Sequence, residues 1–400
     1  MFNILVVSDY DSRVKWGMSL ARRLCTPETI DVVLLPHQVD KVARYINGTR
    51  NKFVRNNPIE FLNHARLDVY DIVVVALGGG ANVKAAAIVK QRFVEGQRRP
   101  LLVGGFNGLT DRNDPDAILC RVGLDLVTVN CQDDLQSFER ILSEVGADAP
   151  SLLVSGYLRD YRSCTNTAKQ GRHILFVQQD GVPKSAKAYR YLITGLCQFV
   201  QANPEATLAI KLRDENRIGI NRQNSTYDAR QLTDSIIKRA GENARIFLDF
   251  RDVEEIMEDC NEVWSISSTV LLEALALGKR SASISDFGIS RYLGNAPFVG
   301  SGLFIGLERL RQGAHVEVDE TWKRRNAPPS MPQDQLVRAI KLEMAKLAQN
   351  SFLMRRPYYE PSPWLAQTNR GPSFFSMVGD WVRKLGASSY KEAGFYKKGE

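Results

Sequence analysis

Three hydroxyl side chains stand in a row after an apolar run, in WSISSTVLLEALALGKR (residues 264–280). We expect a strand to end there and a helix to open at Ser267, Ser268 and Thr269. A helix that opens at the carboxyl edge of a parallel sheet offers backbone N–H groups, which favour a phosphate. Glu273, one turn further on, is placed to accept a hydrogen bond from a ribose hydroxyl. The alternative is plain N-capping, but one hydroxyl would satisfy that role.

Two cations occupy alternate positions near the end of the run TLAIKL, at Lys211 and Arg213. Residues i and i+2 of a strand project to the same side, so both are expected at the carboxyl end of one strand. There they suit a phosphate or a sugar carboxylate, and a solvated strand end is the alternative. Gln179 follows the first strand in the same half of the chain, so we expect it to contact the same ligand.

Two carboxylates follow the first apolar run, in SDYDSRVKW (residues 8–16). We expect Asp9 and Asp11 in a loop after a strand, with Ser12 capping the next helix and Lys15 orienting one carboxylate from one turn along. A carboxylate at this edge is suited to take a proton from a hydroxyl group. The alternative is that both acids only satisfy the loop and the start of the helix.

Glycines cluster after another apolar run, as LGGGANVK (residues 77–84). This segment lacks the spacing of a dinucleotide-binding fingerprint and the acidic residue at the end of the next strand, so it favours a tight turn at the cleft. No Asp-x-Asp motif follows an apolar run as a metal-dependent site would require. We therefore predict no metal site.

The elements that must position these residues follow from hydrophobic periodicity. Continuous apolar runs bounded by turn residues are typical of parallel strands that are buried on both faces. Strands are expected at 3–7, 31–35, 71–77, 100–105, 124–129, 151–155, 173–177, 207–212, 244–248, 262–266 and 281–285, and helices at 12–25, 133–146, 186–202, 229–240, 252–259 and 268–277.

Alternating strands and helices predict the α/β class, with two tandem Rossmann-like, doubly wound domains. The pattern restarts after a polar stretch, so the boundary is expected within 160–172 and the domains at 1–165 and 166–330. Residues 331–400 are expected to form a C-terminal helix and a basic tail. Two such domains with a helix that crosses back describe the GT-B architecture, which serves glycosyltransferases and also some epimerases.

Composition excludes several classes of protein. The 400 residues are 44% hydrophobic and 24% charged, which excludes a largely disordered chain. No apolar run approaches the roughly 18 residues of a membrane span, and the N-terminal segment resembles a first strand rather than a signal peptide. Six isolated cysteines without a CxxC motif exclude a disulfide scaffold and a zinc ribbon, and they indicate a reducing cytoplasm.

The net charge of +8 belongs to the C-terminal fifth, since residues 321–400 hold 14 Lys and Arg against 6 Asp and Glu. A neutral body argues against a nucleic-acid partner. In FFSMVGDWVRKL (residues 374–385), helical spacing places Phe, Met, Val, Trp and Leu on one face beside basic residues. That stripe suits an anionic membrane surface, which would make a cytoplasmic protein peripheral at the inner membrane. The alternative is that the stripe packs back onto the first domain.

Two adjoining segments resemble transferases of known architecture. The string SSTVLLEALALGK is similar to the C-terminal-domain signature of GT-B transferases that build bacterial surface polysaccharides, including sialyl-, Kdo- and CDP-glycerol-type transferases. The preceding RIFLDFRDVEEIMEDCNEVWS is similar to the segment before that signature, which implies that the strand end near Phe250 and Arg251 faces a nucleobase. Sialyltransferases carry a His-Pro pair where this chain has Leu212 and Arg213, a departure from that group.

Four further stretches resemble, in order, a little-characterised family of bacterial glycosyltransferases. They are SDYDSRVKWGMSL, RPLLVGGFNGL with RVGLDLVTVNCQDDLQSF, ILFVQQDGVPKSAKAYRYL, and LAIKLRDE. The first centres on DSxxKW, which places Asp11 ahead of Asp9 as the general base. The GGFNG segment (residues 104–108) is expected to line the acceptor side.

The resemblance implies a metal-independent, inverting glycosyltransferase without a cofactor. It would move a sugar from a nucleotide donor to a surface glycan or a lipid-linked glycan. A CMP-linked acidic sugar, such as a nonulosonic acid or Kdo, is the preferred donor because paired cations suit a carboxylate. UDP- and GDP-sugars and CDP-glycerol stay open, as do two other functions: a UDP-sugar epimerase, and an inactive scaffold for polysaccharide assembly.

Overall fold

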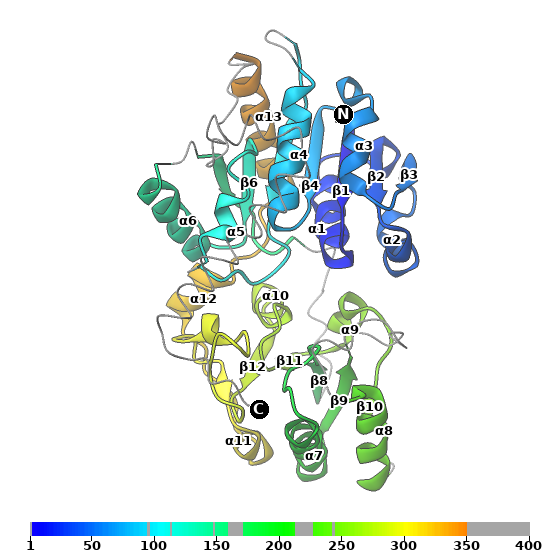
Figure 1. Cartoon of the computed structure of the whole chain (residues 1–400). Coiled ribbons are helices and arrows are strands. Elements are labelled where there is room, and N and C mark those ends of the chain that lie inside the picture. The colour runs from blue at the N-terminus through cyan, green and yellow to red at the C-terminus, as the bar shows by residue number, and fades with distance from the viewer. Residues whose placement is uncertain are drawn as a thin grey trace, which may run out of the picture. The chain divides into compact units, whose positions relative to one another are not determined.

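Seven parallel strands form the first β-sheet, in the order β3-β2-β1-β4-β5-β6-β7 (Figure 1). The computed structural model describes residues 2–93, 97–112, 114–146, 149–158, 171–212, 227–241 and 245–349. The strands of this sheet are β1 (Ile4–Ser8), β2 (Ile30–Leu34), β3 (Asn51–Val54), β4 (Ile72–Ala76), β5 (Leu101–Gly105), β6 (Leu126–Val129) and β7 (Ser151–Val154).

Six parallel strands form the second sheet, in the order β10-β9-β8-β11-β12-β13. Its strands are β8 (Arg172–Val177), β9 (Ala206–Lys211), β10 (Ile246–Leu248), β11 (Glu262–Ser265), β12 (Arg280–Ile284) and β13 (Phe304–Ile305). Both sheets confirm the predicted pair of Rossmann-like domains.

Helices connect the strands and cover the sheets. The α-helices are α1 (Asp11–Arg22), α2 (Ala43–Ile46), α3 (Pro58–His64), α4 (Gly79–Gln91), α5 (Asp116–Leu119), α6 (Gln132–Glu144), α7 (Ala186–Ala202), α8 (Ala229–Arg239), α9 (Val253–Asp259), α10 (Val270–Ala276), α11 (Leu307–Arg311), α12 (Glu320–Asn326) and α13 (Gln333–Gln349). Short 3-10 helices lie at Pro27–Thr29, Pro36–Gln38, Asp40–Val42, Leu67–Val69 and Ala296–Phe298.

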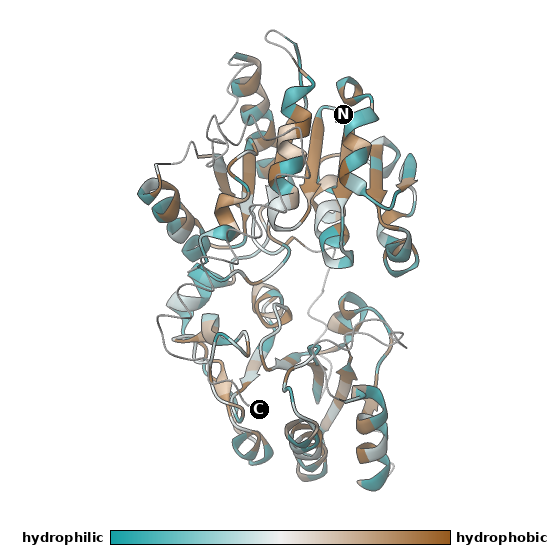
Figure 2. Cartoon of the chain, viewed as in Figure 1, coloured by the Kyte–Doolittle hydropathy of each residue, from teal (hydrophilic) through white to brown (hydrophobic). Residues whose placement is uncertain are grey.

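Each sheet is buried on both faces, as the continuous apolar runs require. Along β1, Ile4 and Val6 belong to one hydrophobic cluster, while Leu5 and Val7 belong to another. Strand β8 likewise divides its side chains between two clusters. The central strands of the first sheet are accordingly brown in Figure 2, while helices that cover them carry teal outer faces.

The strand order locates the ligand-binding edge of each sheet. Strand β1 lies between β2 and β4, and β8 lies between β9 and β11, so the chain winds outward in both directions from these strands. In open α/β sheets, ligands bind beyond the carboxyl ends of the strands at such a switch point. Asp9 follows β1, while Gln179 and Ser267 lie just beyond β8 and β11.

Several elements were not predicted: strands β3 and β13, and helices α2, α3, α4, α5, α11 and α12. Strand β3 has the sequence NKFV and lies at an edge, with side chains that are exposed or half-buried, so it carries no continuous apolar run. Strand β13 has only two residues. The glycine segment at 77–84, which was expected to make a tight turn, is instead mostly helical, because α4 begins at Gly79.

The chain returns to the first sheet after the second. Leu336 and Ile340 of α13 are fully buried in a cluster with residues of β1 and β2. Ser151 Oγ donates to Glu343 Oε2 over 2.8 Å, and Met331 N donates to Ser155 O over 2.8 Å. The described part of the predicted tail, helix α13, therefore packs against the first sheet.

Several predictions concern residues outside the described ranges. These are Arg213, most of the expected boundary at 160–172, and the stripe at 374–385. Among the described helices, none is long and apolar enough to cross a membrane.

Candidate functional site

The hydroxyls after β11 cap α10 and connect neighbouring strands. Helix α10 begins at Val270, two residues later than expected, and Thr269 at the N-cap position makes no side-chain capping bond. Ser268 Oγ instead accepts from Val270 N over 3.3 Å, and Leu271 N donates to Ser268 O. Since these N–H groups already have partners, any anion here would be held by hydroxyl groups rather than by the start of the helix.

Ser267 and Gln179 meet at the switch point of the second sheet. Ser267 Oγ donates a hydrogen bond to Gln179 Oε1, which joins the segments after β11 and β8. Ser267 is 3% exposed, and Gln179 closes a short antiparallel bridge with Val182. The structure therefore brings together two residues that were predicted independently from separate stretches of sequence.

Thr269 contacts the first half of the chain. Leu109 N, in the loop after β5, donates to Thr269 Oγ1 over 3.0 Å. Gly108 lies so close that a Cβ built on it would stand 2.7 Å from Thr269 Oγ1. Sequence reasoning assigned this glycine segment to the acceptor side but missed its contact with Thr269, because only the fold brings the two segments together.

Glu273 is 2% exposed, so the ribose contact predicted for it has no open surface in this conformation.

Lys211 ends β9, and its Nζ donates a hydrogen bond to Phe250 O over 3.5 Å. Lys211 and Phe250 thus lie together at the carboxyl edge, as expected. Phe250 is 46% exposed, with the guanidinium of Arg230 4.9 Å from its ring centre.

Arg251 is held by acids rather than pointing freely toward a base. Its Nη2 lies 2.7 Å from Asp249 Oδ2, and its Nη1 lies 2.6 Å from Asp259 Oδ2. Burial opposes ionisation of Asp249, but the hydrogen bonds and charge of Arg251 outweigh it and lower the pKa of Asp249. The Arg251 guanidinium is therefore engaged by two carboxylates, although its side chain is 48% exposed.

The two carboxylates after β1 have different surroundings. Asp9 Oδ1 accepts from Arg13 Nη1 over 2.7 Å, and Asp9 Oδ2 accepts from Gly78 N over 3.3 Å. Asp11 Oδ1 accepts from the neighbouring Ser12 N over 2.8 Å. Asp9 therefore forms an ion pair with Arg13, whereas Asp11 accepts a hydrogen bond from the adjacent backbone N–H of Ser12.

Two predicted supporting roles are wrong in detail. Helix α1 already begins at Asp11, so Ser12 lies inside its first turn, and its hydroxyl accepts from Asn107 Nδ2 over 2.7 Å instead of capping. Lys15 lies 3.6 Å from Asp252 Oδ1 and 5.0 Å from the ring centre of Tyr45, so the cation that orients a carboxylate of this loop is Arg13. The i,i+4 spacing of Asp9 and Arg13 was the missed signal.

Arg44 was also missed, because nothing in its local sequence marks it. Its guanidinium pairs with Asp252 over 2.9 Å, and with Glu254 and Glu255 over 2.7 Å each. Together with Lys15 it joins α1 and α2 to the start of α9. This cluster links the two halves of the chain beside the Asp11 loop.

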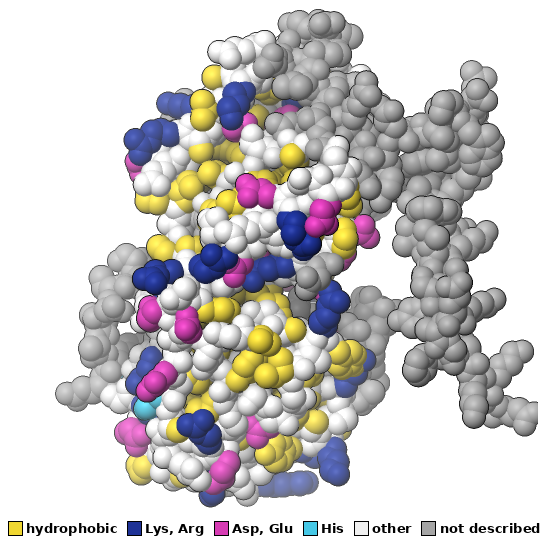
Figure 3. Space-filling model, turned by 90° about the vertical axis from the view of Figure 1, so that its left-hand side faces the viewer, with side chains coloured by type: hydrophobic (Ala, Val, Ile, Leu, Met, Phe, Trp, Pro, Cys, Tyr) yellow, Lys and Arg dark blue, Asp and Glu magenta, His cyan; other side chains and the backbone are white. Residues whose placement is uncertain are grey.

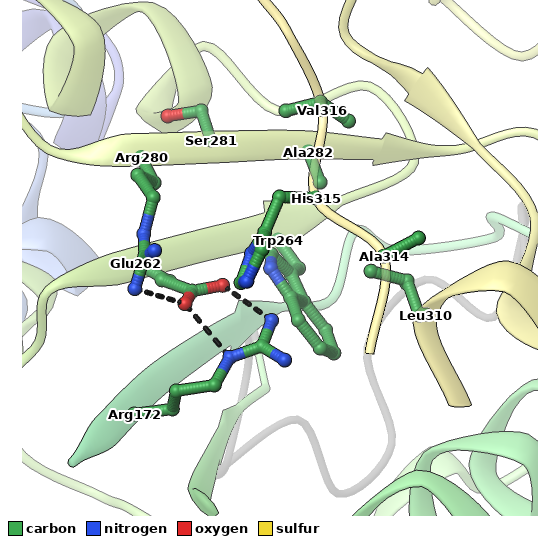
Figure 4. Close-up of a pocket in the computed structure, with 10 residues that line it drawn as sticks. All are labelled: Arg172, Glu262, Trp264, Arg280, Ser281, Ala282, Leu310, Ala314, His315 and Val316. Carbon is green, nitrogen blue, oxygen red and sulfur yellow. Dashed lines mark hydrogen bonds and ion pairs between the residues drawn. The ribbon is translucent and has the colours of Figure 1, made fainter. Parts of the chain in front are cut away.

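A second charged cluster lies at the opposite, amino edge of the second sheet (Figure 4). Glu262 accepts from Arg172 Nε over 2.9 Å and pairs with Arg280 Nη2 over 2.6 Å, and Glu262 is 2% exposed. His315 lines the same small pocket. Because each charge begins a strand and is satisfied by its neighbours, this cluster is a structural tie between β8, β11 and β12.

Among the described residues, no group of three His, Cys, Asp or Glu side chains is arranged to hold a metal ion. The predicted residues that the structure does bring together are Gln179, Ser267, Ser268 and Thr269, with Lys211 and Phe250 at the end of β9.

Solved structures share this fold at low sequence identity. A Staphylococcus aureus MnaA structure with UDP matches with a TM-score of 0.57 and 12% identity, over 86% of this chain and 97% of the other. A structure described as a UDP-N-acetylglucosamine 2-epimerase from Listeria monocytogenes matches with a TM-score of 0.53 and 14% identity, over 88% of this chain and 97% of the other. The Arabidopsis thaliana protein UGT89C1 matches with a TM-score of 0.50 and 8% identity, over 86% of this chain and 94% of the other. At these identities the likeness shows the fold alone.

A search of curated sequences finds no match to the chain. A family model, in contrast, matches most of it. Residues 4–342 fit the family described as "Putative glycosyltransferase (DUF6716)", which spans both sheets and the start of the returning helix. The chain therefore belongs to this glycosyltransferase family, with two Rossmann-like domains of the GT-B type.

Proposed function

We propose that the protein transfers a sugar from a nucleotide donor to a glycan, with the donor bound at the carboxyl edge of the second sheet. The observation that carries this proposal is the convergence of Gln179, Ser267, Ser268 and Thr269 at the switch point of that sheet. Hydroxyl and amide groups at such an edge are the polar groups that orient a nucleotide.

Thr269 is the residue best prepared to bind a phosphate oxygen. A threonine hydroxyl has one proton to donate and two lone pairs with which to accept. Because Thr269 Oγ1 already accepts from Leu109 N, its proton is available to donate to a phosphate. Lys211, at the end of β9, would add positive charge for the leaving nucleotide, and Phe250 would offer a face to the base.

Asp11 is the proposed general base toward the acceptor hydroxyl. A base needs a carboxylate oxygen that can accept the proton of the acceptor hydroxyl, and both oxygens of Asp9 already accept hydrogen bonds. Asp9 is paired with Arg13, whereas the hydrogen bond of Asp11 comes from the adjacent backbone. Arg13 and Asp9 would then position the loop that carries Asp11.

The nucleotide of the donor is an open part of the proposal. The resemblance to surface-polysaccharide transferases favours a CMP-linked acidic sugar, such as a nonulosonic acid or Kdo. The Staphylococcus aureus structure with the same fold contains UDP, so UDP stands beside CMP. The acceptor would be a surface glycan or a lipid-linked glycan.

A thermal-shift screen of the full chain against CMP, CDP, UDP and GDP tests the donor site. A ligand at 100 times its Kd stabilises the folded state by about 2.7 kcal/mol, which is readily detected. We expect one nucleotide to stabilise the protein clearly more than the others. If none shifts the melting temperature at millimolar concentration, the donor-site proposal is wrong. Binding of a UDP-sugar with conversion to its epimer, and without transfer, would instead favour the epimerase alternative.

A further inference from the structure

Large apolar side chains lie exposed beside the candidate donor site. We call this surface the aromatic platform, and it consists of Lys184, Tyr191, Phe287, Ile289 and Tyr292. Tyr191 is 55% exposed, Ile289 49% and Tyr292 59%. Exposed aromatic side chains in a group mark interaction surfaces more often than single ones do.

The platform is built from two segments that contact each other. Tyr191 OH, on α7, donates to Asp286 Oδ1 over 2.9 Å, and its ring lies edge-on to Phe287, with ring centres 6.1 Å apart. The ammonium group of Lys184 lies 3.9 Å from the ring centre of Tyr292. The loop after β12 therefore runs alongside the start of α7 and is held to it at two points.

The loop that carries most of the platform is firmly held from below. Asn295 is fully buried, donates to Gly288 O over 3.0 Å and accepts from Ser290 N over 2.9 Å. Phe298, just beyond, is also fully buried in the core. Exposed side chains on a fixed backbone lose little conformational entropy on binding, which is the arrangement that a recognition surface needs.

Both segments of the platform adjoin the candidate donor site. A Cβ built on Gly294 would lie 3.5 Å from Ser267 Oγ, so the loop after β12 packs against this serine. The other segment leaves β8 through Gln179, whose side chain binds Ser267, and reaches Lys184 five residues later. A ligand that spans the platform therefore ends beside the predicted site of sugar transfer.

Two lysines place positive charge beside the platform. Lys187 lies one turn before Tyr191 on the same face of α7, and Lys184 lies against Tyr292. The other charged side chains nearby already have partners: Arg291 pairs with Asp111 over 2.7 Å, Glu308 pairs with Arg311 over 2.7 Å, and the carboxylate of Asp286 accepts from Tyr191 OH and Leu307 N. Figure 3 shows hydrophobic side chains gathered in the lower half of one face of the molecule, with both basic and acidic side chains around them.

We propose that the aromatic platform binds the chain of an acidic glycan acceptor, an inference that rests on the proposed transferase function. The apolar C–H faces of sugar rings pack on aromatic rings, while basic side chains pair with sugar carboxylates. The nucleobase is a poorer fit, because small-molecule sites enclose most of their ligand, whereas Tyr191 and Tyr292 are more than half exposed. An extended chain matches a surface formed by several rings along two segments.

The test compares four forms of the full-length protein: wild type, the double variant Tyr191→Ala with Tyr292→Ala, Tyr292→Phe, and the control Phe247→Ala. Phe247 is a 42% exposed aromatic residue of the same sheet, outside the platform. Binding to immobilised polysialic acid and to neutral dextran is measured by biolayer interferometry. Nucleotide affinity is measured separately for each form.

We expect wild type, Tyr292→Phe and Phe247→Ala to bind polysialic acid more tightly than dextran, and the double variant to bind it on the order of tenfold more weakly. Nucleotide affinity should stay within about twofold in all four forms. The proposal is overturned by absence of polysialic acid binding in wild type, by equal binding of dextran, or by a double variant that binds like wild type. It is also overturned if the double substitution instead dissolves a dimer seen by light scattering. Absence of nucleotide binding in wild type would contradict the proposed function, whatever the result for glycans.

Discussion

Leu109 N donates a hydrogen bond to Thr269 Oγ1 over 3.0 Å, although the two residues are 160 positions apart in the sequence. The same loop reaches the carboxylate side through Asn107, which donates to Ser12 Oγ in the first turn of α1. One short segment therefore contacts both the proposed phosphate-binding hydroxyl and the helix that begins with the proposed base. This segment therefore links the proposed donor site to the loop that carries the proposed base.

Gly108→Ala should destabilise the protein by roughly 1–3 kcal/mol, because the new methyl group would stand 2.7 Å from Thr269 Oγ1. Thr269→Ala removes that atom, and the remaining Cβ would lie at 3.6 Å. The double variant should therefore lose less stability than the sum of the single changes, as urea denaturation can measure. Gly306→Ala is the matched control, since its Cβ would meet only Asp286 oxygens at 3.6 Å or more. Strictly additive losses would show that the two residues are not in contact in solution.

Ser268→Ala together with Thr269→Ala should weaken nucleotide binding while the fold is retained. Ser268 Oγ accepts from Val270 N at the start of α10, and losing such a capping bond costs about 0.5–2 kcal/mol of stability. Titration calorimetry with the nucleotide found in the screen separates the two effects, since only a binding role changes Kd. A Kd equal to that of wild type would leave these hydroxyls as capping groups alone.

The sequence was sufficient to predict the elements that carry continuous apolar runs. These runs mark all the strands of both sheets except β3 and β13, because burial on both faces leaves a local signal. The contacts of Lys15 and Arg251 could not be predicted in the same way. Each has an acidic partner whose position depends on the packing of other elements, and the partner of Lys15 lies at the N-cap of α9, in the other half of the chain.

Hydroxyls were easier to place than charges. Ser267 and Gln179 were predicted from their positions after two strands, and the sheet order makes those strands neighbours. Glu273 was assigned to a ligand from its spacing, but the apolar residues around it on α10 bury it. Spacing along a helix predicts which residues share a face. It does not predict which face the rest of the protein buries, because that depends on how the helix packs.

Asp11→Asn should keep donor affinity and lose most transfer, since a positioned base contributes about 10²–10⁴-fold to the rate. Asp9→Asn should have a smaller effect on kcat, because Asp9 acts through its pair with Arg13. Single-turnover rates with saturating donor distinguish the two. If Asp9→Asn abolishes turnover and Asp11→Asn does not, the base is Asp9, and if neither changes the rate, the base lies elsewhere.

His315 should make the protein less stable in mild acid. Burial, followed by the nearby charge of Arg172, lowers the pKa of His315, with Arg280 adding to the effect and Glu262 opposing it. The unfolded chain therefore takes up a proton near pH 6.5 more readily than the folded one, so stability falls as pH drops below that value. His315→Asn cannot titrate, and its unfolding free energy should decrease less than that of wild type between pH 7.5 and about pH 5. Parallel losses in both proteins would remove His315 as a contributor.

Acceptor-dependent release of nucleotide tests the central claim most directly. The full chain is incubated with CMP-, CDP-, UDP- and GDP-linked sugars, with and without an acidic glycan, and free nucleotide and glycan mass are followed together. We predict that one donor releases its nucleotide only when glycan is present, that the glycan gains one sugar, and that Asp11→Asn abolishes both changes. Donor consumption without a glycan product, or conversion of a nucleotide-sugar to its epimer, would contradict the account.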